Sequence, residues 1–439
     1  MSGCRPIRMG AFVAMTGLGL VAATTADELF FARGGRAELP TRVEGDRVRV
    51  EGPGGSYEFR REDFRALRPR PTIDQEWSVR LERARSGGAE GRFQGAWWAL
   101  VHGLTPEAEA LLREAHTLDP GHRPTDRLVA LLDRLVARRV DPDLASLRAL
   151  MPGPTAVERG RGVVLIEATT TPREVTVERL DLLDRGATTF LLLMTARGFT
   201  LDTPRHRLPI LWFETVDDYR AFLRAEGASA LGATTGYYHP TRRLVAVCDP
   251  KTTPIDRRRR DDDRRRLLGE LEARSVRIGT AMHELVHLLV AETGLEPAAG
   301  AFPLWLHEGL AMQFEATVGG RWAGLGRVNA IRLGHWRGLA ERPRLAPLVR
   351  DVGFEPGYAT DRYAAAWAIV FYLQSERPRE FVAFLDLLRA PGCGPEGRSE
   401  RFEACFREAF GDDLGAIERS WRRFMAGLEE PPGMAAGVR

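Results

Sequence analysis

Near its N-terminus the chain alternates hydrophobic and polar residues in short runs. Such runs occupy residues 47–51 and 57–60, and the stretch between them, Gly-Pro-Gly-Gly at 52–55, is rich in turn-forming residues. Because successive side chains of a strand face opposite sides of a sheet, this pattern predicts a β-hairpin. We expect a small β module over residues 27–70, with no grouping of residues that suggests catalysis.

Hydrophobic residues then recur with helical spacing from about residue 75 to residue 150. The part from Trp98 to Pro120 resembles one tetratricopeptide unit, with an alanine-rich second helix that ends in Leu-Asp-Pro. A packed helical linker would give the same pattern. We therefore expect a short helical segment over residues 71–152 and keep both interpretations of it open.

After the Pro-Gly-Pro boundary at 152–154 the pattern becomes mixed. We expect an α+β domain over residues 160–428, in which a small mixed sheet precedes a set of helices, and a flexible tail at 429–439. The early elements of this domain are two buried strands, two helices and one hairpin, expected at 162–167, 208–213, 176–194, 216–224 and 236–247, respectively.

Residues 1–26 have the pattern of an export signal. Two arginines precede an uncharged apolar run, Ala11 to Ala23, and small residues lead up to Ala26. The run is shorter than the roughly 20 residues that a membrane-spanning helix needs. We expect cleavage after Ala26 and export to the periplasm or the cell exterior, although an uncleaved leader could tether the chain. No later segment is expected to span a membrane.

Composition narrows the choice of partner and ligand. The 439 residues include 63 basic and 60 acidic ones, a net charge of +3, which gives no reason to expect a nucleic-acid partner. The four cysteines lack the CxxC spacing of a thiolate metal site, so any metal needs other ligands. Cys393 and Cys405 could pair or remain reduced. A dense charge run at 257–266 is interpreted as a solvated helix start or an exposed insertion.

A helical hydrophobic stripe at 275–293 carries the sequence His-Glu-Leu-Val-His at 283–287. Residues four apart lie on one face of a helix, so His283 and His287 can bind one ion, with Glu284 beside them. A catalytic zinc site takes three protein ligands and keeps one position for water. Glu308, which lies 21 residues beyond His287 in an apolar segment, is the predicted third ligand, because burying a carboxylate without a partner is costly.

These motifs resemble the gluzincin clan of zinc metallopeptidases. The stretch 305–311, Trp-Leu-His-Glu-Gly-Leu-Ala, is similar to the WLxEGxA signature of the clan, as in the M1 aminopeptidases, and implies that Glu308 is a ligand. Residues 362–373 resemble the tyrosine-bearing helix of the clan. The resemblance implies Tyr363 as the hydroxyl that stabilises the reaction intermediate, with Tyr358 and Tyr372 as rivals. The wider layout from about 160 to 428 is similar to secreted bacterial proteins grouped as DUF1570.

The sequence also departs from the clan. The GxMEN motif, through which aminopeptidases recognise a free amino end, is absent, so internal cleavage is expected. At Met312 there is no carboxylate that could orient a zinc histidine, and the acceptor is therefore unidentified. Gly309 is expected to let the two zinc helices approach, and His307 to serve in packing or capping. His239 is expected at a surface turn.

Together these features predict an exported zinc peptidase that acts on a peptide or protein. Zn²⁺ held by His283, His287 and Glu308 would activate water, with Glu284 as general base and Tyr363 beside the developing charge. The alternative is a catalytically weak or inactive protein of the same fold that acts as an interaction module in the cell envelope, with residues 27–150 binding a protein partner.

Overall fold

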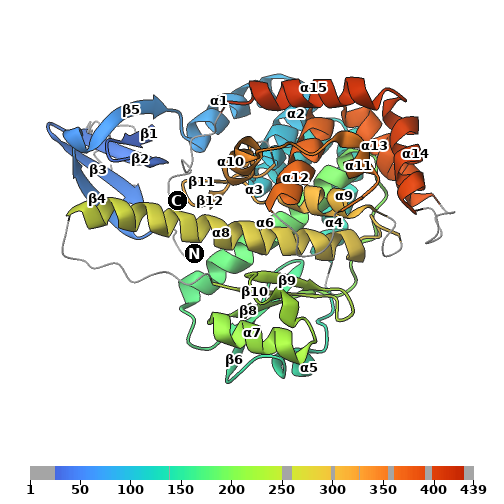
Figure 1. Cartoon of the computed structure of the whole chain (residues 1–439), viewed down its shortest axis with the longest axis horizontal. Coiled ribbons are helices and arrows are strands. Elements are labelled where there is room, and N and C mark those ends of the chain that lie inside the picture. The colour runs from blue at the N-terminus through green and yellow to red at the C-terminus, as the bar shows by residue number, and fades with distance from the viewer. Residues whose placement is uncertain are drawn as a thin grey trace, which may run out of the picture.

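The computed structural model describes residues 25–137, 139–249, 260–297, 302–325, 327–353, 360–390 and 398–429. It shows a mixed α+β protein organised around one long helix, α8 (Arg260–Glu292), which crosses the molecule (Figure 1). A β module packs against the N-terminal end of α8, a five-stranded sheet lies on one side of the helix, and the C-terminal helices lie on the other. The expected α+β class is confirmed.

The β module is a five-stranded antiparallel sheet of order β4-β3-β2-β1-β5. The predicted hairpin is confirmed as β3 and β4, while β1, β2 and β5 were not predicted. The last two residues of the expected leader, Thr25 and Ala26, begin β1, and residues 1–24 lie outside the described residues. The elements of the module are β1 (Thr25–Phe31), β2 (Arg36–Glu44), β3 (Arg47–Gly52), β4 (Gly55–Arg60), the 3₁₀ helix η1 (Arg61–Asp63) and β5 (Phe64–Arg70).

The start of α8 completes the core of the β module. Leu267 and Leu271 are buried among the hydrophobic side chains of the module, and the hydroxyl of Tyr57 donates to the carboxylate of Glu270 at 2.5 Å. Arg264 donates to the carbonyl of Gly34. The predicted helix start is therefore confirmed for the described part of the charge run, from residue 260 onward, and the structure adds that one face of this helix docks on the module. Residues 257–259 lie outside the described residues.

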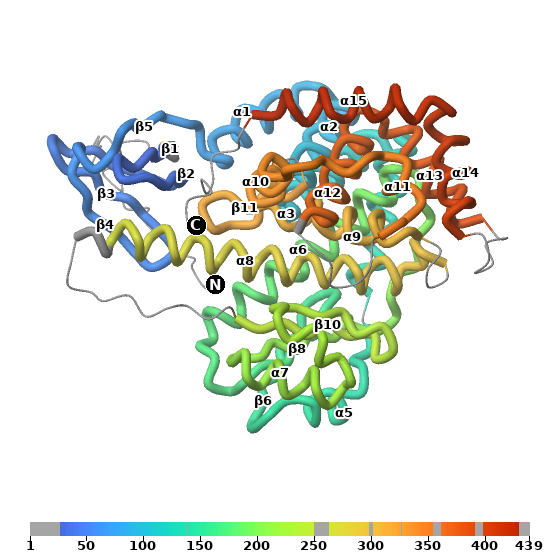
Figure 2. Tube along the Cα trace, viewed as in Figure 1, coloured from blue at the N-terminus to red at the C-terminus, as the bar shows by residue number. Residues whose placement is uncertain are grey.

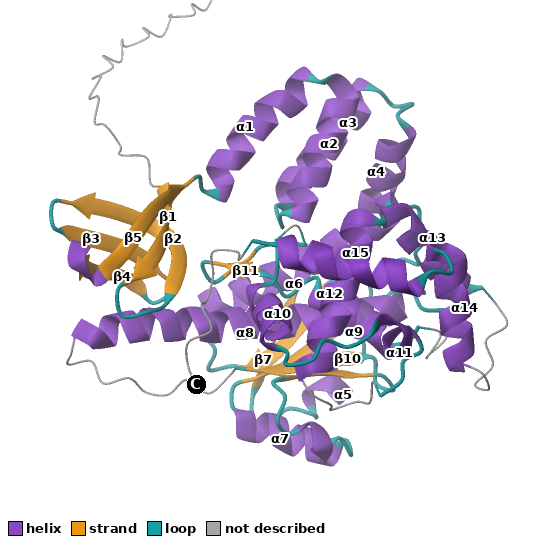
Figure 3. Ribbon diagram, turned by 45° about the horizontal axis from the view of Figure 1, so that its top comes forward, coloured by secondary structure: helices purple, strands orange, loops and turns teal. Residues whose placement is uncertain are grey.

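The predicted helical segment is confirmed, and Figure 3 shows α1 to α4 side by side, whereas α5 lies apart from them near the central sheet. Gly95 allows α2 to approach its neighbours closely, since a Cβ atom there would lie 2.6 Å from Ala84 and 2.9 Å from Leu111. The helices α1 to α4 share one hydrophobic core with the helices that follow them, whereas Leu147 of α5 packs with the face of the central sheet that carries α7. Its helices are α1 (Ile73–Ser86), α2 (Gly88–Val101), α3 (Thr105–Leu118), α4 (Arg123–Val136) and α5 (Leu144–Arg148).

The central sheet has the order β6-β7-β8-β10-β9, with β7, β8 and β10 parallel and both outer strands antiparallel. Side chains of one face pack with α6 and α8 and those of the other face with α7, which explains why the inner strands are hydrophobic throughout. The predicted elements are confirmed, and β6 is an addition. They are β6 (Thr155–Arg159), β7 (Val163–Ala168), α6 (Arg173–Ala196), β8 (Leu208–Phe213), α7 (Val216–Ala225), η2 (Ser229–Leu231), β9 (Gly236–His239) and β10 (Leu244–Cys248).

The C-terminal part is helical apart from a short β-ribbon, and it covers the side of α8 opposite the sheet (Figure 2). Trp305 is fully buried there and stacks on Phe384 with ring centroids 5.9 Å apart. The elements are α9 (Leu304–Met312), β11 (Thr317–Val318), β12 (Arg321–Trp322), α10 (Ala330–Gly338), α11 (Leu345–Val349), α12 (Thr360–Glu376), α13 (Pro378–Arg389), α14 (Arg398–Phe410) and α15 (Leu414–Gly427).

Several sequence predictions concern residues that the structure describes only in part. Cys405 is buried on α14, but its possible partner Cys393 lies outside the described residues, as does Tyr358. The expected tail is described only at Glu429. Within the described residues, no helix combines the length and the apolar character that crossing a membrane requires.

Candidate metal centre

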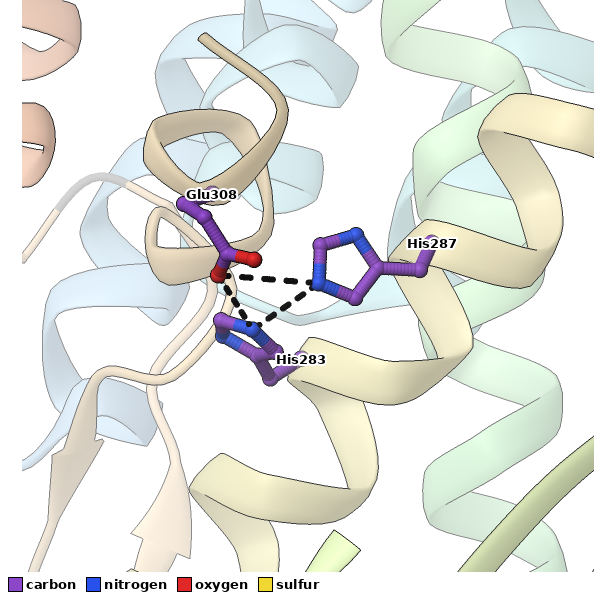
Figure 4. A group of neighbouring side chains, drawn as sticks. All are labelled: His283, His287 and Glu308. Atoms are coloured by element: carbon purple, nitrogen blue, oxygen red, sulfur yellow. Dashed lines mark hydrogen bonds and ion pairs between the residues drawn. The ribbon is translucent and has the colours of Figure 1, made fainter. Parts of the chain in front are cut away.

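Two helices bring the three predicted ligands together. His283 and His287 project from adjacent turns of α8, and Glu308 faces them from α9 (Figure 4). The Nε2 atoms of the two histidines are 3.0 Å apart, and Oε2 of Glu308 lies 3.0 Å from Nε2 of His283 and 3.7 Å from Nε2 of His287. The predicted grouping of these three residues is therefore present in the structure, and it could hold a metal ion.

The spacing of these donor atoms suits a small divalent cation. A tetrahedral ion with bonds of about 2.0–2.1 Å separates its ligand atoms by about 3.3 Å, and the three observed distances bracket this value. Oε2 of Glu308 is also buried, and it faces the Nε2 atoms of both histidines. A buried carboxylate is costly unless positive charge beside it neutralises it, and a cation bound between these three atoms would supply that charge. The residues present therefore fit a metal ion.

A carboxylate that the sequence analysis missed orients the first histidine. Nδ1 of His283 lies 2.8 Å from Oε1 of Glu315. The two oxygens of this carboxylate together accept two hydrogen bonds of 2.7 Å from Arg332 and one of 3.0 Å from Asn329. A carboxylate in this position fixes the tautomer of a metal-binding histidine and aims its Nε2 atom. The acceptor that the sequence left unidentified is thus Glu315, which stands three residues after Met312, just beyond the end of α9.

The pKa values of the site reflect burial and charge. Burial opposes a charged imidazole, but the carboxylates of Glu308 and Glu315 outweigh it and raise the pKa of His283 to about 10. For His287, burial dominates and lowers the pKa to about 4. Burial also opposes ionisation of Glu315, yet the charge of Arg332 prevails and lowers its pKa to about 2. A cation between the ligands would replace the proton of His283 in balancing the carboxylates.

Glu284 lies between the metal-binding face of α8 and the edge strand β9. The backbone N–H of Tyr238 donates to its carboxylate, and burial raises its pKa to about 7. Gly236 makes the close approach possible, because a Cβ atom there would lie 2.8 Å from Cγ of Glu284 and closer still to Thr280. The predicted base is therefore a partly ionised carboxyl group near neutral pH, held against a sheet edge.

Tyr363 lies beside the site on α12. It is half-buried, and the guanidinium of Arg332 lies 5.9 Å from the centre of its ring. Burial raises the pKa of Tyr363, and the negative charges of Glu308 and Glu284 raise it further. Its rival Tyr372 is buried against Phe424 in the hydrophobic core. Of the described tyrosines on this helix, Tyr363 is the one whose pKa responds to the charges of Glu308 and Glu284, and its role remains a prediction.

Two minor expectations need correction. Gly309 does not face α8: a Cβ atom there would lie 2.7 Å from the carbonyl oxygen of Ala366, so this glycine allows α9 to pack against α12. His239 is not a surface residue, since it is 8% exposed and its Nε2 lies 3.0 Å from Glu226. The expectation that His307 serves in packing is confirmed: its ring packs against the ring of His287, with centroids 4.6 Å apart.

Comparison with known proteins assigns the segment around this centre to a family. Residues 277–391 match the family described as protein of unknown function (DUF1570). The match confirms the resemblance to DUF1570 over these residues, which include all three possible ligands, Glu284 and Tyr363. No curated protein matches the chain. The DUF1570 match names no activity, so the chemistry of the site has to be argued from its residues.

Proposed function

We propose that the protein is an exported zinc-dependent endopeptidase. The observation that carries this proposal is the convergence of His283, His287 and Glu308 within 3.0–3.7 Å of one another, with Glu284 beside them. Two imidazoles and one carboxylate are the ligand set of many catalytic zinc sites, in which a fourth position remains for water or substrate. The export signal pattern of residues 1–26 supports action outside the cytoplasm.

The chain supplies the proton transfers of peptide hydrolysis. When bound, Zn²⁺ acts as a Lewis acid and lowers the pKa of a coordinated water. Glu284, with a pKa raised by burial to about 7, is suited to accept the proton of the attacking water and then to deliver it to the leaving nitrogen. In this proposal, Tyr363 donates a hydrogen bond to the oxygen on which negative charge develops.

The position of β9 supports a peptide as the substrate. It is an outer strand of the central sheet, pairs with β10 on one side, and directs the backbone N–H of Tyr238 towards Glu284. An extended peptide can add to such an edge through main-chain hydrogen bonds, which position a peptide bond without strong sequence preference. The absence of the GxMEN motif favours cleavage within a chain over removal of its first residue.

The test combines metal analysis with digestion of a diverse peptide library by the parent protein and by Glu284→Gln. We expect about one zinc per chain in both. Cleavage by the variant should fall by at least about 10²-fold, since the general base is lost. A matched control is Glu272→Gln, an exposed glutamate of the same helix, which should leave both properties unchanged.

Two results would refute the proposal: a parent protein that binds no zinc, or cleavage that survives Glu284→Gln undiminished. Zinc binding without cleavage of any peptide would instead favour the interaction module, in which residues 27–150 recognise a partner.

A further inference from the structure

The two histidines of the metal centre are held in different ways. His283 is fixed through its Nδ1 atom, which bonds to Glu315. Nδ1 of His287 is buried and has no hydrogen-bond partner among the described residues. Rotation of an imidazole about its last side-chain bond has a broad energy profile, so a ring without a partner at Nδ1 is poorly fixed unless something packs on its face. The structure shows what packs there.

The ring of His307 lies flat against the ring of His287. Their centroids are 4.6 Å apart and their planes differ by 15°. Tyr238 is farther away, at 6.3 Å and 32°. His307 and Glu308 are consecutive residues of α9, and both contact His287: the side chain of His307 covers the face of its ring, and that of Glu308 lies 3.7 Å from its Nε2 atom.

The ring of His307 is itself fixed. Its Nε2 atom lies 3.2 Å from Oε2 of Glu296, whose side chain is 9% exposed. The other oxygen of Glu296 accepts the backbone N–H of Phe302 at 3.1 Å, just before α9 begins. The carboxylate therefore ties His307 to the turn that leads into its own helix, and the stacked ring has a defined orientation.

From this geometry we infer that His307 is a positioning residue, which replaces the missing hydrogen bond of His287 by stacking and keeps its Nε2 atom aimed at the metal. The inference rests on the proposed metal centre. It assigns to His307 neither ligation nor proton transfer. Stacked rings contribute about 0.5–1.5 kcal/mol beyond their buried area, so loss of the ring should weaken metal binding by about 2-fold to 10-fold.

The experiment compares His307→Ala, His307→Phe and the parent protein. Zinc affinity is measured by chelator competition, and the visible absorption spectrum of the cobalt(II)-loaded protein reports the geometry of the ligands. A matched control is His116→Ala, which removes an exposed histidine of α3 paired with Asp126. Circular dichroism checks that each variant is folded.

We expect His307→Ala to bind zinc about 2-fold to 10-fold more weakly and to change the cobalt spectrum. His307→Phe keeps a planar ring and should remain close to the parent in both measurements, as should His116→Ala. Parent-like behaviour of His307→Ala would overturn the inference, and so would a loss in His307→Phe equal to that in His307→Ala, since the stack would then not be what matters. A parent protein that binds neither metal would instead refute the proposed function, and the inference with it.

Discussion

Glu315 offers the sharpest test of how the site is built, through the substitution Glu315→Gln. The surrounding charges lower the pKa of this carboxyl group from 4.5 to about 2, and its side chain is only 9% exposed. At 1.36 kcal/mol per pKa unit, this lowering of the pKa corresponds to about 3 kcal/mol of stability at pH 7. Glutamine carries no negative charge and cannot make this stabilising interaction, so the metal-free variant should be less stable than the parent by about 3 kcal/mol at pH 7.

The sign of the pH dependence follows from the direction of the shift. A carboxyl group with a lowered pKa stabilises the folded state fully above the unfolded value of 4.5, and this contribution is lost as the pH falls towards 2. The difference between parent and variant should therefore shrink to about 2 kcal/mol at pH 3.5. Removal of the acceptor of His283 should also weaken zinc binding by about 10-fold to 100-fold.

The assay is urea unfolding of the metal-free proteins between pH 7 and pH 3.5, together with chelator competition for zinc at pH 7. Glu380→Gln is the control, because Glu380 forms an ion pair with Arg377 at the protein surface, far along the chain from the centre. It should change stability by less than about 1 kcal/mol. A difference between parent and Glu315→Gln that stays constant with pH, or zinc binding that is unaffected, would refute the reasoning.

Three further predictions concern the reacting groups. Burial raises the pKa of Glu284 to about 7, so ionisation of this group destabilises the folded protein. In the metal-free protein, Glu284→Gln should therefore raise stability by up to about 3 kcal/mol above pH 7 and leave it unchanged below pH 4.5. Thermal unfolding of parent and variant across this pH range would show the difference. Gly236→Ala should push β9 away from Glu284 and slow peptide cleavage while zinc stays bound, whereas unchanged kinetics would mean that the strand adjusts freely. Tyr363→Phe should slow cleavage by about 10²-fold to 10³-fold at unchanged zinc affinity, and an equal rate would exclude it as the donor to the developing charge.

The metal-binding grouping could be predicted from the sequence because its signals are local. The two histidines stand four residues apart on one helical face, and Glu308 is a charged residue in a hydrophobic stretch. The mixed sheet was predictable for a similar reason, since its inner strands are short runs of continuous hydrophobic residues. In each case the pattern within about ten residues already contains the information.

The rest depends on contacts between distant parts of the chain. Glu315 meets its partners Arg332 and Asn329 only after the chain has passed through β11 and β12, and nothing near Glu315 in the sequence points to them. The contact between the start of α8 and the β module could not be predicted either, because the side chains that bury Leu267 and Leu271 come from a distant part of the chain. Such pairings are set by tertiary structure, which local periodicity does not encode.

The central claim is that His283, His287 and Glu308 bind one divalent cation. Zinc K-edge X-ray absorption of the full-length protein, loaded with one equivalent of zinc, tests it most directly. The account predicts two imidazole nitrogens and oxygen ligands at about 2.0–2.2 Å. A spectrum without imidazole scattering, or one that shows sulfur ligands, would contradict it.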